Sequence, residues 1–139
     1  TSVSVTFSVA VTASHCLVSE HSGILSIGAL DVTAVGSGNS AALTTASATI
    51  NQDEELCYCG AGMLGNNVVL TSGGGFVSRL TPTRGGVEDR ITSVVETLTG
   101  GWTVLTGDDW QCILACFKAA TAGAVAVAVL DESYVMTAF

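Results

Sequence analysis

Strict alternation of apolar and polar residues near the start of the chain constrains its fold more than any other feature. Apolar side chains stand at every second position from Val3 to Val11, with Ser, Thr and one Ala between them. A repeat of two places successive side chains on opposite faces of a strand. This segment therefore predicts a half-buried β-strand, with Phe7 on its apolar face.

Strand-like segments separated by glycine-containing turns continue along the chain. The alternation and the β-branched content predict further strands at residues 16–20, 43–50, 56–63, 68–71, 76–80, 87–98, 102–106 and 110–118. Turn clusters rich in Gly, Asn, Ser and Asp separate them, at residues 36–40, 65–67, 73–75, 85–86, 100–101 and 107–109. No segment combines a helical repeat with helix caps. We therefore expect an all-β protein, an antiparallel β-sandwich of the jelly-roll type.

A chain of 139 residues suits one domain, and the residue pattern changes near residue 121. We expect residues 1–120 to form the sandwich and residues 121–139 to add a C-terminal strand or arm. Ala and Val alternate from 124 to 129, so one face of that strand would carry only methyl groups. Tyr134 and Phe139 are candidate contacts with the body or with a neighbouring subunit.

Charge is scarce in this chain and mostly negative. Four basic residues stand against twelve acidic ones, and the net charge is −8. Nucleic-acid binding is disfavoured because neutralising phosphates needs a basic patch. Hydrophobic residues make up 48% of the chain, which excludes intrinsic disorder. A surface of Ser, Thr, Gly and Asn is easiest to explain if neighbouring subunits cover much of it.

No apolar run approaches the roughly 20 residues that a membrane-spanning helix needs, so we expect no membrane partner. Thr1 is not an initiator Met and no signal-like segment precedes it. The chain is then expected to be either processed or part of something longer.

Five cysteines form an odd set, so at least one is unpaired within the chain. Cys57 and Cys59 share a face of one strand but lie too far apart for an easy disulfide. Buried free thiols in a protein that folds in a reducing cytoplasm are the expected state. A metal site built from these two cysteines with His15 and His21 would need a tertiary coincidence, so no metal is expected.

Patterns that suggest catalysis have simpler explanations here. His15 and Cys16 are neighbours, as are Glu20 and His21, and neighbours in a strand point to opposite faces. The Gly36-x-Gly38-x-x-Ala41 motif resembles a dinucleotide fingerprint, but a Thr-rich strand follows it instead of a helix. The three glycines at 73–75 lack the Lys and Ser/Thr of a phosphate loop. We therefore expect no enzyme activity.

Charged clusters offer two further expectations. The acidic residues at 53–55 and 108–109 are predicted as solvated turn residues, with a loop Ca²⁺ site as the functional alternative. Glu88, Asp89 and Arg90 predict an inter-strand ion pair, worth little if it is exposed.

Trp102 and Trp110 flank the predicted turn at 107–109, which places them on the two strands of one hairpin. They are expected as core anchors. If exposed on one face, they would instead stack on a sugar or make a subunit contact.

Short motifs follow one another in a set order from Val3 to Ala119. They are Val5-Thr6-Phe7; Val18-x-Glu20-x-Ser22-Gly23; Leu30-Asp31; Glu55-Leu56; Gly74-Gly75-Phe76; Val87-Glu88-Asp89-Arg90; Gly100; and Trp110 leading to Ala115-Cys116-Phe117-Lys118. In order and spacing they resemble a family of jelly-roll, concanavalin-like β-sandwich modules of bacteriophage virion and bacterial surface proteins. That family usually has apolar residues in place of Cys57 and Cys59, and it has no counterpart to residues 121–139.

The resemblance implies a non-enzymatic scaffold, a capsid decoration (cement) protein or fibre component at the surface of a virion, made in the host cytoplasm. Expected partners are other virion proteins, such as a major capsid protein, and further copies of this chain, with a trimer favoured. No cofactor is implied. The alternative function is a carbohydrate-binding module with a stacking tryptophan and a Ca²⁺ in the loop at Asp108 and Asp109.

Overall fold

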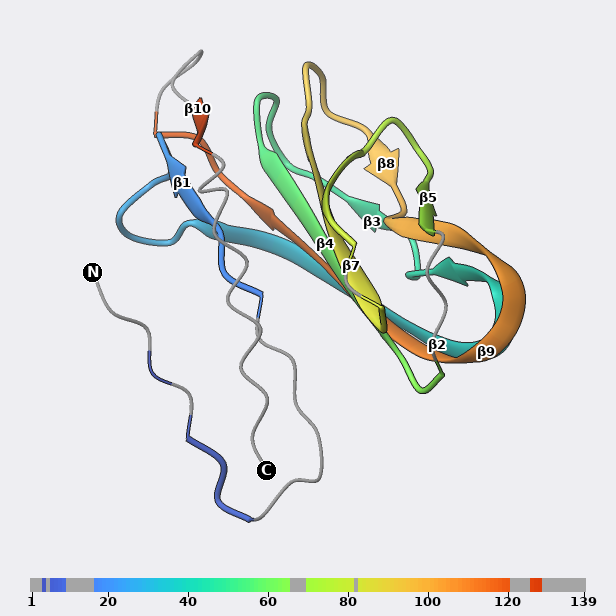
Figure 1. Cartoon of the computed structure of the whole chain (residues 1–139). Helices are drawn as coiled ribbons and strands as arrows, with labels where there is room; N and C mark the ends of the chain where they lie inside the picture. Colours follow the sequence, from blue (N-terminus) through green and yellow to red (C-terminus); the bar gives the residue numbers. More distant parts are fainter. Residues whose placement is uncertain are drawn as a thin grey trace.

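The computed structural model describes residues 4, 6–9, 17–65, 70–81, 83–120 and 126–128. All regular secondary structure in these residues is β-strand (Figure 1). The strands are β1 (Glu20–Ser22), β2 (Leu30–Thr44), β3 (Ala48–Thr49), β4 (Leu56–Met63), β5 (Leu70–Ser72), β6 (Val77–Leu80), β7 (Gly85–Ile91), β8 (Thr97–Leu98), β9 (Gly101–Phe117) and β10 (Ala126–Ala128). The predicted all-β class is confirmed.

One antiparallel sheet dominates the described part of the chain. Its strands lie in the order β2-β9-β4-β7-β6, and β5 pairs with one end of β9. Two small antiparallel pairs, β3 with β8 and β1 with β10, accompany it. The arrangement is consistent with an all-β sandwich, and jelly-roll connectivity stays a prediction. The β1–β10 pair joins the predicted C-terminal segment to the rest of the chain through residues 126–128.

The two longest strands, β2 and β9, run together along the sheet and curl over at one end (Figure 1). The curl brings β2 back on itself, so that the Ala46 N–H donates to the Val35 carbonyl over 3.0 Å. Gly36 makes this approach possible, since a Cβ there would collide with the Thr44 carbonyl. A Cβ at Gly38 would lie 2.9 Å from the Trp110 ring. Glycine therefore lets these backbones approach closely within strands.

The turns predicted at 36–40 and 107–109 are consequently wrong. Both segments lie inside the paired strands, with Asn39 opposite Asp109 and Ser40 opposite Asp108. Trp102 and Trp110 belong to the single strand β9 and not to two arms of a hairpin. The turn predicted at 85–86 is also wrong, since these residues begin β7. Gly85 lies so close to the Ala61 carbonyl that a side chain would not fit there.

Other boundaries agree more closely with the sequence. Strand β4 has the predicted bounds and lies in the sheet interior between β9 and β7. The turn at 73–75 is confirmed, with positive φ at Gly74 and Gly75. Of the strand predicted to span Val3 to Val11, the described residues 4 and 6–9 are not in a strand, and residues 3, 5, 10 and 11 lie outside the described residues.

The core lies on one side of the main sheet, which we call the inner face. Alternate residues of β4 and β9 point to it, and Cys57, Cys59, Leu114 and Cys116 are completely buried there. The cysteines among the described residues are free and buried, as predicted, while Cys16 lies outside the described residues. The opposite side, the outer face, carries the intervening residues of the same strands.

Candidate functional site

Apolar side chains on the outer face stay in contact with solvent. Val35 of β2 and Ile113 of β9 are direct cross-strand partners, and their side chains are 65% and 51% exposed. Leu30, opposite Phe117 in the same strand pair, is 53% exposed. Exposed apolar side chains that lie close together on one face commonly mark a protein–protein contact surface.

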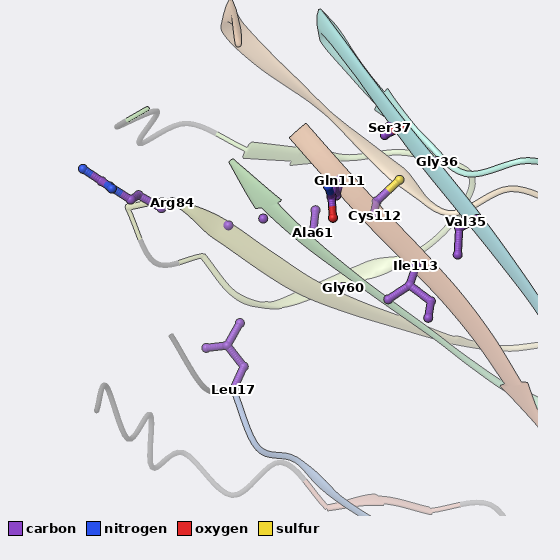
Figure 2. A pocket seen from close by; sticks show the side chains of 12 residues that line it. Leu17, Val35, Gly36, Ser37, Gly60, Ala61, Arg84, Gln111, Cys112 and Ile113 are labelled. Carbon is purple, nitrogen blue, oxygen red and sulfur yellow. The ribbon is translucent and has the colours of Figure 1, made fainter. Parts of the chain in front are cut away.

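A shallow hollow extends across this face, with a volume of about 840 Å³ (Figure 2). Gly60 and Gly62 of β4 line it, and Val35, Ile113 and Leu17 contribute apolar side chains. Because the two glycines carry no side chains, the backbone of β4 is accessible at the floor. The hollow can accept apolar side chains of another chain, and its described lining residues include no Asp, Glu or His.

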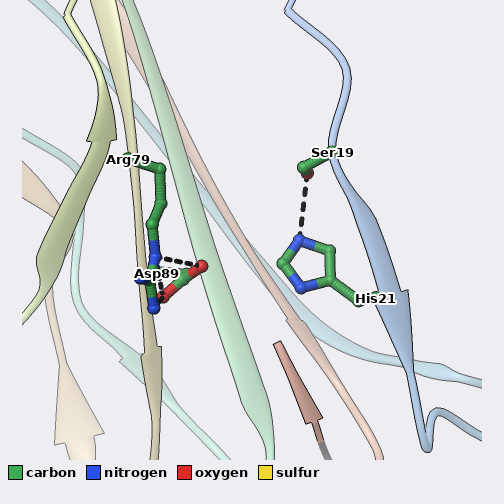
Figure 3. Close-up of polar contacts among 4 residues, drawn as sticks. All are labelled: Ser19, His21, Arg79 and Asp89. Atoms are coloured by element: carbon green, nitrogen blue, oxygen red, sulfur yellow. Dashed lines mark hydrogen bonds and ion pairs between the residues drawn. The ribbon is translucent and has the colours of Figure 1, made fainter. Parts of the chain in front are cut away.

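Strand β1 covers a neighbouring part of the outer face. The His21 ring packs edge-on against Tyr58 of β4, with 5.6 Å between ring centroids and an interplanar angle of 75°. His21 Nε2 lies 3.0 Å from the Ser19 hydroxyl oxygen (Figure 3). Burial lowers the pKa of His21 more than the nearby Asp89 carboxylate raises it.

This Ser–His contact was not anticipated, although a repeat of two places residues 19 and 21 on the same face of an extended segment. A nucleophile and a base at this distance would still need a group to orient the imidazole. His21 Nδ1 is buried without a hydrogen-bond partner, and the Asp89 carboxylate, whose charge acts on His21, is paired with Arg79. The contact is therefore best explained as packing of β1 on the sheet.

The ion pair predicted near residue 89 exists, but it is not exposed. The Arg79 guanidinium of β6 donates three hydrogen bonds of 2.7 to 3.0 Å to the Asp89 carboxylate of β7 (Figure 3). Asp89 is buried, whereas the Arg79 side chain is 26% exposed. Charge-assisted bidentate pairs of this kind are stronger than ordinary surface pairs.

Both tryptophans proposed as contact or stacking residues are buried. Trp102 belongs to one core cluster and Trp110 to the other, and the Trp110 indole N–H donates to the Ser40 hydroxyl over 3.1 Å. Neither ring offers an open face to a sugar, because the curl of β2 and β9 encloses them. Tyr134 and Phe139 lie outside the described residues.

The acidic turns also differ from the prediction. Asp108 accepts a 2.6 Å hydrogen bond from the Gly65 N–H, and Asp109 accepts one of 2.6 Å from the Asn39 side chain. These carboxylates thus hold strand segments together. Glu55, predicted as a solvated turn residue, is fully buried. Within the described ranges no group of three or more His, Cys, Asp or Glu side chains is placed to hold a metal ion.

A charged cluster, formed by Asp31, Asn51, Glu55 and Lys118, lies where β2 begins and β9 ends. Its two carboxyl side chains are buried, whereas Asn51 is exposed and the Lys118 side chain is 31% exposed. Lys118 Nζ is 3.1 Å from Asp31 Oδ1, and the Asp31 side chain is only 2% exposed. The Asn51 backbone N–H donates to Asp31 Oδ2 over 2.8 Å, and its side-chain amide donates to Asp31 Oδ1 over 2.9 Å. Burial raises the pKa of Asp31, but the Asn51 and Lys118 hydrogen bonds outweigh it and bring that pKa to about 2.

Glu55 completes this cluster as a second buried carboxyl group. Its side-chain oxygens are buried, and the group interacts with the Asp31 carboxylate and the Gln52 backbone N–H. Burial, followed by the hydrogen bond and negative charge of Asp31, raises the pKa of Glu55 to about 7. Its backbone is fixed, because the Glu55 N–H donates to the Thr92 hydroxyl and the Thr92 N–H donates to the Glu55 carbonyl, each over 3.0 Å.

A second buried glutamate, Glu88, lies on the inner face of β7. Its Oε1 accepts the Gly101 N–H over 2.9 Å, and its Oε2 has no partner. Burial raises the pKa of Glu88 to about 7, against smaller lowering effects of the Gly101 N–H and the Ser72 hydroxyl. Glu88 is therefore as buried as Glu55, but the groups that act on its pKa are Gly101 and Ser72, whereas Asp31 and Lys118 act on Glu55.

Comparison with known proteins identifies no relative: no family model, no curated protein and no solved structure matches this chain. In the portion of the chain that the structure describes, no helix is long and apolar enough to cross a membrane.

Proposed function

We propose that this protein is a non-enzymatic structural protein of a virus particle, a capsid decoration (cement) protein or fibre component that acts through protein–protein contacts. The observation that carries the contact role is the pair Val35 and Ile113, two exposed apolar side chains that are direct partners on the outer face. The assignment to a virion is supported by the motif resemblance, which also implies jelly-roll connectivity.

The outer face has the properties of a surface that another chain covers. Its exposed residues include the apolar Val35 and Ile113 and the glycines of β4 beside the polar Ser37 and Gln111, and the shallow hollow leaves room for side chains of a partner. The low charge of the whole chain adds to this, since the centres of protein interfaces are depleted in charged residues. A second copy of this chain is the first partner we expect, in a homo-oligomer that we propose to be a trimer.

The oligomeric state tests this proposal. Light scattering coupled to size-exclusion chromatography should give the mass of a homo-oligomer for the wild type. The double variant Val35→Asp/Ile113→Asp should give a monomer, because it places two carboxylates in the contact. Ile27→Asp is the matched control: Ile27 is 88% exposed, lies outside the strands, and should not affect assembly.

Thermal unfolding of each variant separates loss of assembly from loss of folding. A wild type that is monomeric at every concentration would contradict the self-association. An oligomer that survives the double substitution unchanged would show that the contact lies elsewhere.

A further inference from the structure

The charged cluster lies at one end of the β2–β9 pair, where β2 begins and β9 ends. Leu30, the first residue of β2, pairs with Phe117, the last residue of β9. Asp31 follows Leu30 directly, and Lys118 follows Phe117. The side chains of Asp31 and Lys118 thus meet at the end of the main sheet where β2 begins and β9 ends.

A register shift in β2 determines where the Asp31 side chain points. The pairing passes from Leu30 opposite Phe117 to Val32 opposite Cys116, so Asp31 is an extra residue, as in a β-bulge. A bulge redirects a side chain out of the ordinary alternation, and bulges are common beside functional sites. Here the redirected carboxylate is almost completely buried and lies against Lys118 and Glu55.

The backbone holds the reacting groups in place from both sides. The Lys118 N–H donates to the Ala29 carbonyl over 2.7 Å, and the Leu25 N–H donates to the Lys118 carbonyl over 3.0 Å. On the other side, the Asn51 donors fix the Asp31 carboxylate. An amine and a carboxylate held at 3.1 Å have the proximity at which bond formation gains most from orientation.

We propose that Lys118 and Asp31 join covalently through an intramolecular amide bond, with the buried Glu55 carboxyl, which contacts Asp31, as the group that moves protons between them. An ion pair alone does not account for Glu55. A buried carboxyl group held against a second carboxylate is costly in a fold, and such groups concentrate where chemistry takes place.

The reaction balances without a cofactor or an oxidant. Glu55 gives its proton to the Asp31 carboxylate and takes one from the Lys118 ammonium, which leaves a neutral acid and a neutral amine. The amine nitrogen then forms a bond to Asp31 Cγ, and one bond from that carbon to oxygen breaks. That oxygen leaves as water with two protons, the third ammonium proton stays on the amide nitrogen, and Glu55 ends as it began.

The other residues of the cluster favour the same reaction. Burial disfavours the charged form of Asp31, but the Asn51 and Lys118 hydrogen bonds outweigh it, so the proton that the Asp31 carboxylate needs comes from Glu55. Burial and Asp31 also raise the pKa of Glu55 to about 7, so it can both give and accept a proton near neutral pH. The Asn51 N–H groups point at the carboxyl oxygens, where negative charge develops when the amine attacks.

Intact mass spectrometry of the reduced, denatured full chain tests this inference. The folded wild type should weigh one water molecule less than its sequence, and tandem mass spectra of a digest should locate the bond between Lys118 and Asp31. Lys118→Arg should have the full sequence mass, because it keeps the positive charge but lacks the amine. Glu55→Gln should remain largely unlinked.

Glu88→Gln is the matched control, since it also removes a buried carboxyl of raised pKa but lies outside the cluster. It should lose the same water as the wild type. Circular dichroism and cooperative thermal unfolding establish that each variant folds. A folded wild type that keeps its full sequence mass after incubation between pH 5 and pH 8 would overturn the inference. Water loss that persists in Lys118→Arg would do the same.

Discussion

The two faces of the main sheet are built from the same strands but differ in how deeply their side chains are buried. On the inner face, Leu114 of β9 is completely buried, while its chain neighbour Ile113 on the outer face is half exposed. Cysteines occupy four buried positions on β4 and β9, where their small apolar side chains pack closely. Packing thus determines the residues of the inner face, and the outer face is left available for contacts.

Charged residues show the same contrast on β7. Glu88 points to the inner face and has one hydrogen-bond donor, whereas Asp89 points to the outer face and receives three hydrogen bonds from Arg79. Burial keeps Glu88 protonated up to about pH 7. Two adjacent carboxyls are thus accommodated in opposite ways, one by keeping its proton and the other by pairing with a cation.

The largest expected effect comes from truncating the two neighbours on β9. Leu114→Ala should lower the free energy of unfolding by about 3 kcal/mol, because it removes buried methyl groups and leaves a cavity. Ile113→Ala should cost less than about 1 kcal/mol, because that side chain is half exposed. Urea denaturation of both variants measures the difference. Equal losses would show that the outer face is as tightly packed as the inner one.

Ionisation of Glu88 should make stability depend on pH. Its pKa rises from 4.5 in the unfolded chain to about 7 in the fold, so the folded state binds more protons between these values. Stability from this group is therefore complete below about pH 4.5 and declines as the pH rises to about 7, by roughly 3 kcal/mol.

Glu88→Gln removes this decline while leaving an acceptor for the Gly101 N–H. The variant should match the wild type near pH 4.5 and be more stable at pH 8, as measured by urea denaturation across that range. Glu55 adds a slope of the same sign, and Asp31, wherever its carboxylate is not joined to Lys118, adds one of opposite sign below about pH 4 through its low pKa. The difference in stability between the variant and the wild type isolates the contribution of Glu88. If the two proteins lose stability equally between pH 4.5 and pH 8, the raised pKa of Glu88 is contradicted.

Sequence reasoning succeeded where the local pattern and the tertiary environment agree. In strand β4, Cys57, Cys59 and Met63 are buried and the residues between them are less so, in line with the alternation of its sequence, so its bounds and its interior position could be predicted. It failed along β2 and β9, where Gly36, Gly38 and Gly107 have the composition of turns. The reason for those glycines is the close approach of Thr44, Trp110 and Ser40, and no local pattern contains that contact.

The charged cluster was beyond a single-sequence prediction for a similar reason. Asp31, Glu55 and Lys118 come from three distant segments, and the shift in register that redirects Asp31 is visible only once β2 and β9 are paired. One signal was present: each of these charged residues directly follows or precedes an apolar strand residue at the end of a strand. Which strand ends meet is decided by topology, and topology was the part that local periodicity could not supply.

The smallest of the expected effects compares two ion pairs whose acidic partners differ in burial. Arg79→Ala strands the buried Asp89 carboxylate and should cost about 2 kcal/mol, reduced from the cost of a fully buried pair because Arg79 is itself partly exposed. Arg90→Ala breaks a pair with Glu96 in which both side chains are about one-quarter exposed, and should cost about 0.5 to 1 kcal/mol.

Urea denaturation at low and high salt distinguishes the two pairs further. Salt should weaken the Arg90–Glu96 pair, because exposed charges are screened, and should change the effect of Arg79→Ala little. If both variants lose the same stability and respond alike to salt, Asp89 must be hydrated in solution. The outer face would then be open beneath β1 as well as around Val35 and Ile113, and the packing of His21 against Tyr58 would not keep water away from the ion pair.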